Sequence, residues 1–192
     1  MNGMRRNIGA AVMVISAMSA APAIAQEHAS FVERRSHPQV LQADSDKALA
    51  HDIARQVRRY TRYTIFDDVQ IGVDNGVATL SGRVTMSYKA KELGNIVSRV
   101  RGVREVQNDI QTLPVSITDD RLRRSLANQI YRDSVFSTYA FHVNPPIHIV
   151  VERGNVTLTG AVATELERVK AEMIARGTFG VFNVENKLIV AS

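Results

Sequence analysis

The sequence predicts an α+β protein with two tandem modules, each a three-stranded sheet packed against two helices. Three observations carry this prediction: an internal repeat, an α-β-β-α-β order of elements within each repeat, and an apolar N-terminal segment that stands apart from both. The 192 residues suffice for two domains near the lower size limit of independent folding. We expect module 1 at residues 45–113 and module 2 at residues 117–191.

The internal repeat appears when the sequence is shifted by 78 positions. Residues 75–84 then fall on residues 153–162, and residues 102–110 fall on residues 180–188 without a gap. Upstream, a second match at a shift of 73 places Asp46 on Asp119. Two copies indicate a tandem, since a solenoid requires at least three repeats.

Each module opens with an amphipathic helix. In module 1, Leu49, Ile53 and Val57 recur every four residues and therefore share one face of a helix. Asp46, just before them, is expected to be the N-cap. The equivalent residues of the second copy are Asp119, Leu122, Leu126 and Ile130.

A β-hairpin, a second helix and a last strand follow in each copy. Alternating apolar residues predict strands over 69–73 and 77–82, joined by a tight turn at Asn75-Gly76, with counterparts over 147–151 and 156–159. The second helices are expected at 86–101 and 164–177, and the last strands at 103–110 and 181–190. Six glycines are expected at turns and helix ends: Gly76, Gly82, Gly102, Gly154, Gly160 and Gly180.

Residues 1–25 have the pattern of a cleaved secretory signal. Two arginines precede the apolar segment 8–20, and Ala23 and Ala25 occupy the positions that a signal peptidase reads. The segment of about 13 apolar residues is shorter than the roughly 20 that a membrane span requires. We therefore expect an exported protein with no transmembrane span in its mature form, beginning with a flexible arm over residues 26–44.

Composition excludes several classes of function. The net charge is +5, and loss of Arg5 and Arg6 with the signal leaves about +3, which is too low for a dedicated nucleic-acid binder. The absence of cysteine excludes disulfides, thiolate chemistry and lipidation of an N-terminal Cys. The sequence has no phosphate-binding loop or hydrolase motif, and its five histidines are scattered. We expect no catalytic residue, no cofactor and no metal site.

The motifs of the repeat resemble those of the BON domain. They are Gly-Val-Ala-Thr-Leu-Ser-Gly at 76–82, Asn-Val-Thr-Leu-Thr-Gly at 155–160, and Gly-Val-x-x-Val-x-Asn at 102–108 and 180–186. Together with the signal, the chain is similar to periplasmic proteins that carry two BON domains and respond to osmotic stress. The resemblance implies a non-enzymatic protein that binds anionic phospholipid and supports envelope integrity, or one that chaperones exported proteins. Some relatives are anchored by a lipidated Cys; without one, membrane contact is expected to be peripheral and reversible.

Arginines on the first helix of each module form the candidate phospholipid-binding faces. They lie opposite the apolar face, with few acidic residues among them. A guanidinium group forks onto phosphate oxygens and contributes on the order of 1 kcal/mol at an anionic surface. The candidates are Arg55, Arg58, Arg59 and Arg62 in module 1, and Arg121, Arg124 and Arg132 in module 2. An ordinary solvated helix face is the alternative interpretation.

A second candidate surface lies on the helix expected at 164–177. Leu166, Val169 and Met173 form an apolar stripe away from the expected core face. Their counterparts in module 1 are Tyr88, Lys91 and Asn95. The stripe is expected to dock on the other module or on a client protein, and packing into the core is the alternative. With this stripe, the chain could act as a soluble periplasmic chaperone. A third alternative is an accessory protein that recognises peptidoglycan or a partner protein.

Overall fold

The computed structural model describes residues 38–142 and 144–191. All residues that the structure describes belong to one compact unit of the chain. The expected signal with its cleavage site, and residues 26–37 of the expected arm, lie outside the described residues. Within the described part, no helix is both long enough and apolar enough to span a bilayer.

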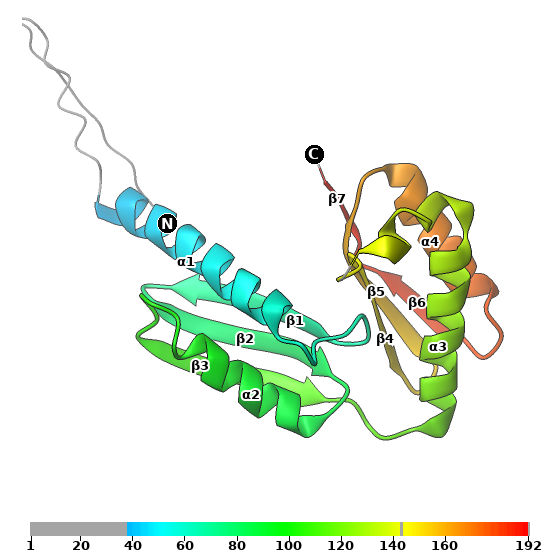
Figure 1. Ribbon diagram of the computed structural model, residues 1–192, viewed down its shortest axis with the longest axis horizontal. Helices are drawn as coiled ribbons and strands as arrows, with labels where there is room; N and C mark the ends of the chain where they lie inside the picture. The colour runs from blue at the N-terminus through cyan, green and yellow to red at the C-terminus, as the bar shows by residue number, and fades with distance from the viewer. Residues whose placement is uncertain (1–37, 143, 192) are drawn as a thin grey trace, which may run out of the picture. The chain divides into compact units, whose positions relative to one another are not determined.

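Module 1 has two helices on one face of a three-stranded sheet (Figure 1). Strand β2 is central, because it pairs antiparallel with β1 and parallel with β3. A parallel pair needs a crossover connection, which α2 supplies between β2 and β3. The elements are α1 (Pro38–Arg59), β1 (Asp68–Asp74), β2 (Val77–Val84), α2 (Ser87–Val97) and β3 (Glu105–Thr112).

Module 2 repeats this order, with two short 3₁₀ helices inserted after its first helix. Strand β5 is central, with β4 antiparallel on one side and β6 and β7 parallel on the other. The elements are α3 (Ile117–Arg132), η1 (Ser134–Phe136), η2 (Tyr139–Phe141), β4 (Ile147–Glu152), β5 (Asn155–Val162), α4 (Glu165–Gly177), β6 (Asn183–Asn186) and β7 (Ile189–Val190). The predicted α+β class with two tandem modules is therefore confirmed.

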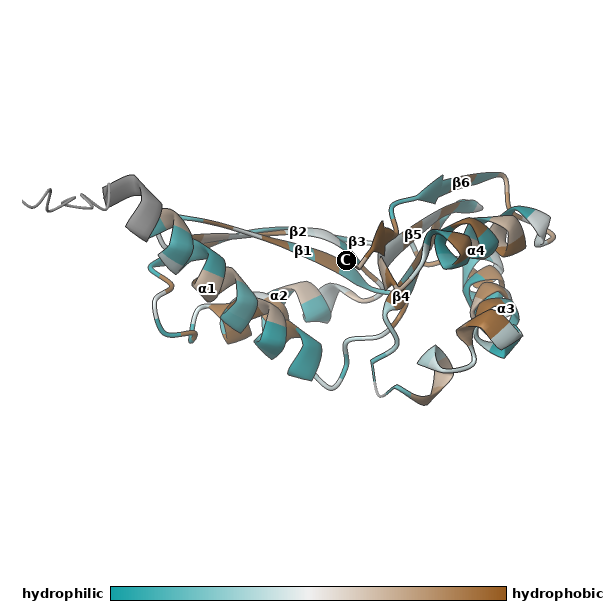
Figure 2. Ribbon diagram, turned by 90° about the horizontal axis from the view of Figure 1, so that it is seen from above, coloured by the Kyte–Doolittle hydropathy of each residue, from teal (hydrophilic) through white to brown (hydrophobic). Residues whose placement is uncertain are grey.

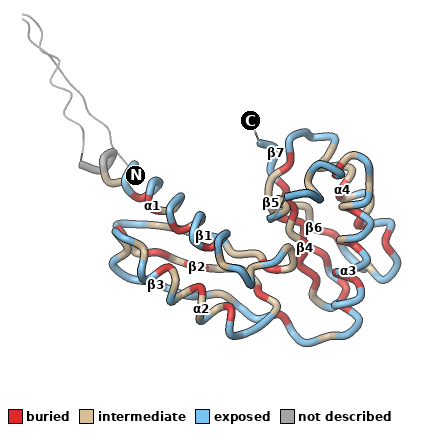
Figure 3. The backbone as a smooth tube through the Cα atoms, viewed as in Figure 1, coloured by how far each residue is buried: buried red, intermediate tan, exposed pale blue. Residues whose placement is uncertain are grey.

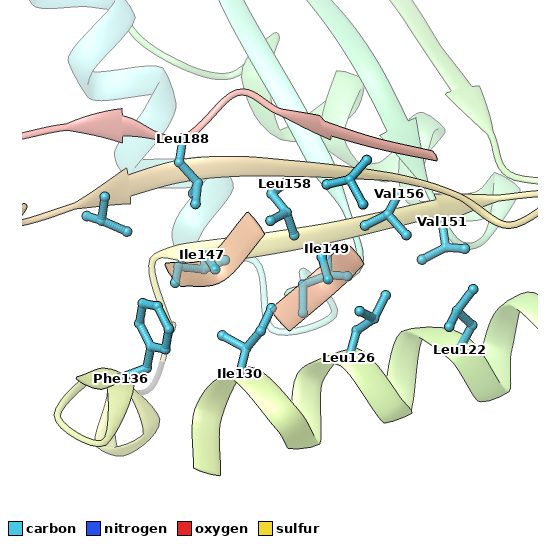
Figure 4. Packing of buried hydrophobic residues seen from close by; sticks show 14 residues of the cluster. Leu122, Leu126, Ile130, Phe136, Ile147, Ile149, Val151, Val156, Leu158 and Leu188 are labelled. Carbon is cyan, nitrogen blue, oxygen red and sulfur yellow. The ribbon is translucent and has the colours of Figure 1, made fainter. Parts of the chain in front are cut away.

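Each module has its own hydrophobic core, formed by separate clusters of buried residues. In module 2, Leu122, Leu126 and Ile130 of α3 point toward β4, and Phe136 closes one end of the core (Figure 4). Buried residues, red in Figure 3, follow β4 and β5, whereas β3 carries none. Both α1 and α3 combine hydrophilic and hydrophobic residues in Figure 2, as expected for helices with one apolar face.

The expected N-caps have a different role. Asp46 lies inside α1, and its carboxylate accepts hydrogen bonds from the backbone N–H groups of Asn75 (2.8 Å) and Gly76 (3.2 Å). Asp119 binds the hairpin turn of module 2 in the same way, while Ser116 caps α3 instead. The amides of Gly76 and Gly154 are buried, and a buried N–H group needs an acceptor within the protein, which these two carboxylates supply.

Three element boundaries differ from expectation. Helix α1 begins at Pro38, within the segment expected to be an arm, because proline is favourable in a first helical turn and Gln42 bonds Asp46 one turn later. Helix α2 ends at Val97, and residues 98–102 form turns. The last strand of module 2 is interrupted between β6 and β7, because Leu188 turns into the core and its N–H donates to the side chain of Asn186.

The six expected turn glycines all have positive φ. Two of them also sit against a neighbouring backbone. At Gly82 a Cβ would overlap the carbonyl oxygen of Asp68, and at Gly160 it would overlap that of Pro146. Both the dihedral and the close approach therefore require glycine at these two positions.

Polar contacts join the two modules between the segment leading into β1 and strand β4. The N–H of Ile149 donates to the carbonyl of Ile65 at 2.7 Å. The Nδ1 of His148 lies 2.6 Å from the carbonyl oxygen of Asp67. His148 therefore has a structural partner, and the described residues contain no cluster of three or more His, Asp or Glu side chains that could hold a metal ion.

Candidate phospholipid-binding site

Helix α3 presents three arginines to solvent. Its core side is fixed by buried leucines and Ile130, and its first turn carries Asp119 and Asp120 after the Ser116 cap. The exposed residues on the opposite side are Arg121, Arg124 and Arg132, which we call the α3 arginine face. None of these three forms an ion pair with a carboxylate in residues 38–142 and 144–191. Among these residues, no carboxylate therefore neutralises the charge of the three guanidinium groups.

The neighbouring Arg123 belongs to the interior and not to this face. Its side chain is buried, with one guanidinium nitrogen against Asp120 and the other donating to the carbonyl of Val151 at 2.6 Å. Because successive residues of a helix point in directions about 100° apart, Arg123 faces β4 while Arg121 and Arg124 face solvent. Arg123 is thus a structural link between α3 and the sheet.

The predicted four-arginine face of module 1 is only partly formed. Arg55, Arg58 and Arg59 are exposed on α1, but Arg55 pairs with Asp52. Arg62 lies beyond the end of the helix, in a turn. This last placement corrects the prediction, because the helix ends where Tyr60 begins a tighter turn.

Arg62 also has partners of its own. One of its guanidinium nitrogens lies 3.0 Å from a carboxylate oxygen of Glu92, and its Cζ lies 5.4 Å from the centre of the Tyr88 ring. Both partners come from α2 and lie far from Arg62 in the sequence. Arg62 therefore contributes less free charge than the arginines of α3.

Two arginines that sequence reasoning missed extend the basic surface of module 1. Arg99 and Arg101 follow α2 and line an open hollow of about 600 Å³ with Arg55 and Arg59 of α1. Asp52 is the one acidic residue that lines it. The second helix was expected to continue to residue 101, whereas the chain turns after Val97 and brings these two arginines beside α1. The run Arg99-Val-Arg101-Gly102, ending at a turn glycine, was the available signal.

The apolar stripe on α4 is exposed. Leu166, Val169 and Met173 all face solvent, while Ala171 and Ala175 form the buried side of the helix. The alternative that the stripe packs into the core is therefore wrong. Module 1 does not cover the stripe in the described part of the chain, as α4 and the elements of module 1 share no substantial contact there.

The adjacent residues Asp67 and Asp68 have different partners. Asp67 is directed toward Lys89 in the interior of module 1, whereas Asp68 accepts a hydrogen bond from Thr159. Burial would raise the pKa of Asp67, but hydrogen bonds from Lys89 and its neighbours outweigh burial and lower that pKa. Asp67 therefore supports the fold, and it lies in the interior of module 1 rather than at the arginine faces.

Comparison with known proteins identifies the modules. The sequence matches the family model described as BON domain over residues 45–114 and 118–192. A search of curated proteins found no match. BON proteins associate in general with phospholipid or the cell envelope, and they are generally binding proteins rather than enzymes.

Two solved structures of CdsD, a structural protein of the type III secretion system of Chlamydia trachomatis, are distantly similar. Its C-terminal domain matches at 14% identity with a TM-score of 0.31, covering 77% of this chain and 67% of that one. The other structure matches at 14% identity with a TM-score of 0.27, covering 76% and 94%. Likenesses this weak carry no argument, so the assignment rests on the family match. Since both modules match the BON domain over most of the sequence, the chain belongs to the BON family.

Proposed function

We propose that this chain is a non-enzymatic periplasmic protein that binds anionic phospholipid at the envelope surface and supports envelope integrity under osmotic stress. The α3 arginine face is the main contact, and the basic hollow of module 1 adds to it. Binding is peripheral and reversible, because no described helix can span a bilayer and the chain lacks a cysteine for lipidation.

The observation that supports this proposal most is that the exposed arginines of α3 lack acidic partners among the described residues. Exposed arginines on helices are commonly paired with acidic residues within one turn, as Arg55 is with Asp52. The α3 arginine face has no such pairs among the described residues. Three unpaired guanidinium groups on one helix face suit the phosphate groups of lipid heads, each of which can accept a forked pair of hydrogen bonds.

Reversal of the arginine charges tests the proposal. We expect Arg121→Glu, Arg124→Glu and Arg132→Glu together to weaken binding to vesicles of phosphatidylcholine and phosphatidylglycerol. At about 1 kcal/mol for each lost cation, the partition coefficient should fall by at least about 100-fold. Co-flotation with vesicles over a series of phosphatidylglycerol fractions and salt concentrations measures it.

A matched control separates the site from the net charge. Lys47, Lys91 and Lys187 are exposed lysines outside α3, and their replacement by Glu changes the net charge by the same amount. This control variant should bind vesicles nearly as well as the native protein. If both variants lose vesicle binding equally, net charge alone explains the effect. If the α3 variant binds vesicles as well as the native protein does, the α3 arginine face is not the binding site.

A chaperone for exported proteins is the second candidate, favoured by the exposed apolar stripe on α4. Leu166, Val169 and Met173 offer an unpaired apolar surface, which is a common feature of sites that bind other proteins. Suppression of aggregation of an unfolded test protein in the absence of lipid, lost on Leu166→Ser with Met173→Ser, would favour this function. Unchanged suppression in that variant would exclude the stripe as the site.

A further inference from the structure

The loop between α4 and β6 carries two exposed phenylalanines. Phe179 is fully exposed (101%) and Phe182 is 83% exposed, although both follow a buried residue, Thr178, that anchors the loop. We call residues 177–182 the aromatic loop. Neither ring belongs to the core of module 2, so the fold does not need them for its own packing.

Module 1 builds the same loop without aromatic residues. The positions equivalent to Phe179 and Phe182 hold Arg101 and Arg104. The backbone is nevertheless alike, since the N–H of Arg104 donates to the carbonyl of Gly76 at 2.8 Å and that of Phe182 donates to Gly154 at 2.9 Å. The loop conformation therefore does not depend on these side chains. The exposed parts of these side chains are therefore free to differ in the external ligand that they contact.

The aromatic loop lies at the end of module 2 where α3 begins. Phe182 lies over the hairpin turn, since a Cβ on Gly154 would be 2.6 Å from a ring carbon of Phe182. The same turn is held by Asp119 in the first turn of α3, and it exposes Arg153. Another exposed apolar residue, Ile117, starts α3 on the side of the arginine face. Aromatic, aliphatic and cationic side chains thus gather at one end.

This combination fits a lipid surface better than a protein groove. Phenylalanine is typical of the apolar side of protein segments that lie in the membrane interface, where it reaches the boundary between head groups and acyl chains, and basic residues beside it meet the phosphates above that boundary. The two rings stand on a loop and are largely exposed. We propose that Phe179 and Phe182 insert into the acyl boundary of an anionic phospholipid bilayer, while Arg121 and Arg124 of the α3 arginine face, in the first half of the helix, hold the head groups. This inference rests on the proposed function and adds the depth and orientation of binding.

Tryptophan fluorescence tests the insertion directly, because the chain contains no tryptophan. Phe179→Trp and Phe182→Trp each place a single reporter on the loop. On anionic vesicles we expect a blue shift of emission and strong quenching by brominated acyl chains. The control is Phe141→Trp, a phenylalanine of the same module that is 89% exposed in η2, after the opposite end of α3.

The control reporter should show neither effect. Equal quenching at Phe141→Trp, or no quenching at the loop in protein that is bound to vesicles, would overturn the insertion and leave the proposed function standing. Loss of both rings, Phe179→Ser with Phe182→Ser, should weaken vesicle binding at least tenfold, since burial of one phenylalanine contributes more than a single tenfold step.

Two further outcomes would also overturn the inference. If no variant and not even the native protein binds anionic vesicles, the proposed function fails together with the insertion. If the loop reporters shift only on addition of an unfolded protein and not on vesicles, the loop binds a protein client instead.

Discussion

Replacement of Lys89 by Met removes one half of the ion pair inside module 1. The Nζ of Lys89 lies 2.6 Å from Asp67 Oδ2 and 2.8 Å from Thr85 Oγ1, and the side chains of the pair are 5% and 0% exposed. Methionine is similar in length and carries no charge. Asp67 would keep its hydrogen bonds from the backbone and side chains of Thr64 and Thr85. The carboxylate would thus remain buried without a cation.

The expected loss of folding stability follows from that uncompensated charge. Removal of one partner of a buried pair costs about 3–5 kcal/mol, and the remaining donors favour the lower end of this range. A small domain has a free energy of unfolding of about 5 kcal/mol or more in total. At about 1 kcal/mol per M of urea, the midpoint for module 1 should fall by roughly 3 M.

The same substitution should change the response to acid. The pKa of Asp67 is lowered in the folded protein, so its ionised form contributes stability above the unfolded pKa, and this is lost as the pH falls through the folded pKa. Without Lys89 that pKa rises, because burial is then opposed by fewer donors. The Lys89→Met protein should therefore unfold at a higher pH than the native protein during acid titration followed by circular dichroism.

Hydrogen exchange measured by mass spectrometry shows which of the two modules loses stability in the Lys89→Met protein. Amides of β1 to β3 should exchange faster in Lys89→Met, while those of β4 and β5 should change little. Lys91→Met, at an exposed lysine on the same helix, should change the free energy of unfolding by no more than about 0.5 kcal/mol. Native-like protection of β1 to β3 and an unchanged acid midpoint in Lys89→Met would refute this reasoning.

Two further substitutions test other features of the fold. Asp119→Ala should lower the free energy of unfolding by about 3 kcal/mol in urea titration, since the buried amide of Gly154 and the partly buried amide of Arg153 lose a charged acceptor. Asp44→Ala on the surface should have little effect, and equal effects of the two substitutions would contradict the role of Asp119 at the turn. Gly160→Ala should lower the midpoint of thermal unfolding, because φ at this position is +107° and the new Cβ would overlap the carbonyl oxygen of Pro146. Gly177→Ala should leave the midpoint unchanged, since the space around Gly177 is open. A native midpoint in Gly160→Ala would contradict the requirement for glycine.

The internal repeat made much of the fold predictable from the sequence. Because the 78-residue shift has no gap around Asn108 and Asn186, equivalent residues occupy equivalent places. The side-chain amide of Asn108 donates to the carbonyl of Ala90, and that of Asn186 donates to Arg168, also 78 residues apart. The local signals for helices and turns were sufficient for the order of elements, since each is set by residues close in the sequence.

Features that depend on distant partners were not predictable. The sequence places Arg62 beside other arginines, but its partner Glu92 is 30 residues away, and their meeting depends on how α2 packs near the end of α1. Asp46 has the spacing of an N-cap, yet its carboxylate is used by a turn 29 residues later. Arg99 and Arg101 were missed because the hollow they line forms only once α1 and α2 are side by side.

The hydrogen bond from residue 104 to Gly76, and its counterpart from residue 182 to Gly154, involves main-chain atoms alone. After duplication of an ancestral module, mutations at these sites could therefore exchange charge for aromatic character without disturbing how the polypeptide is held. A fold whose loops are secured in this manner lets two descendants specialise toward different ligands while inheriting one architecture. Engineered tandems could exploit the same freedom by grafting new recognition side chains at these two sites.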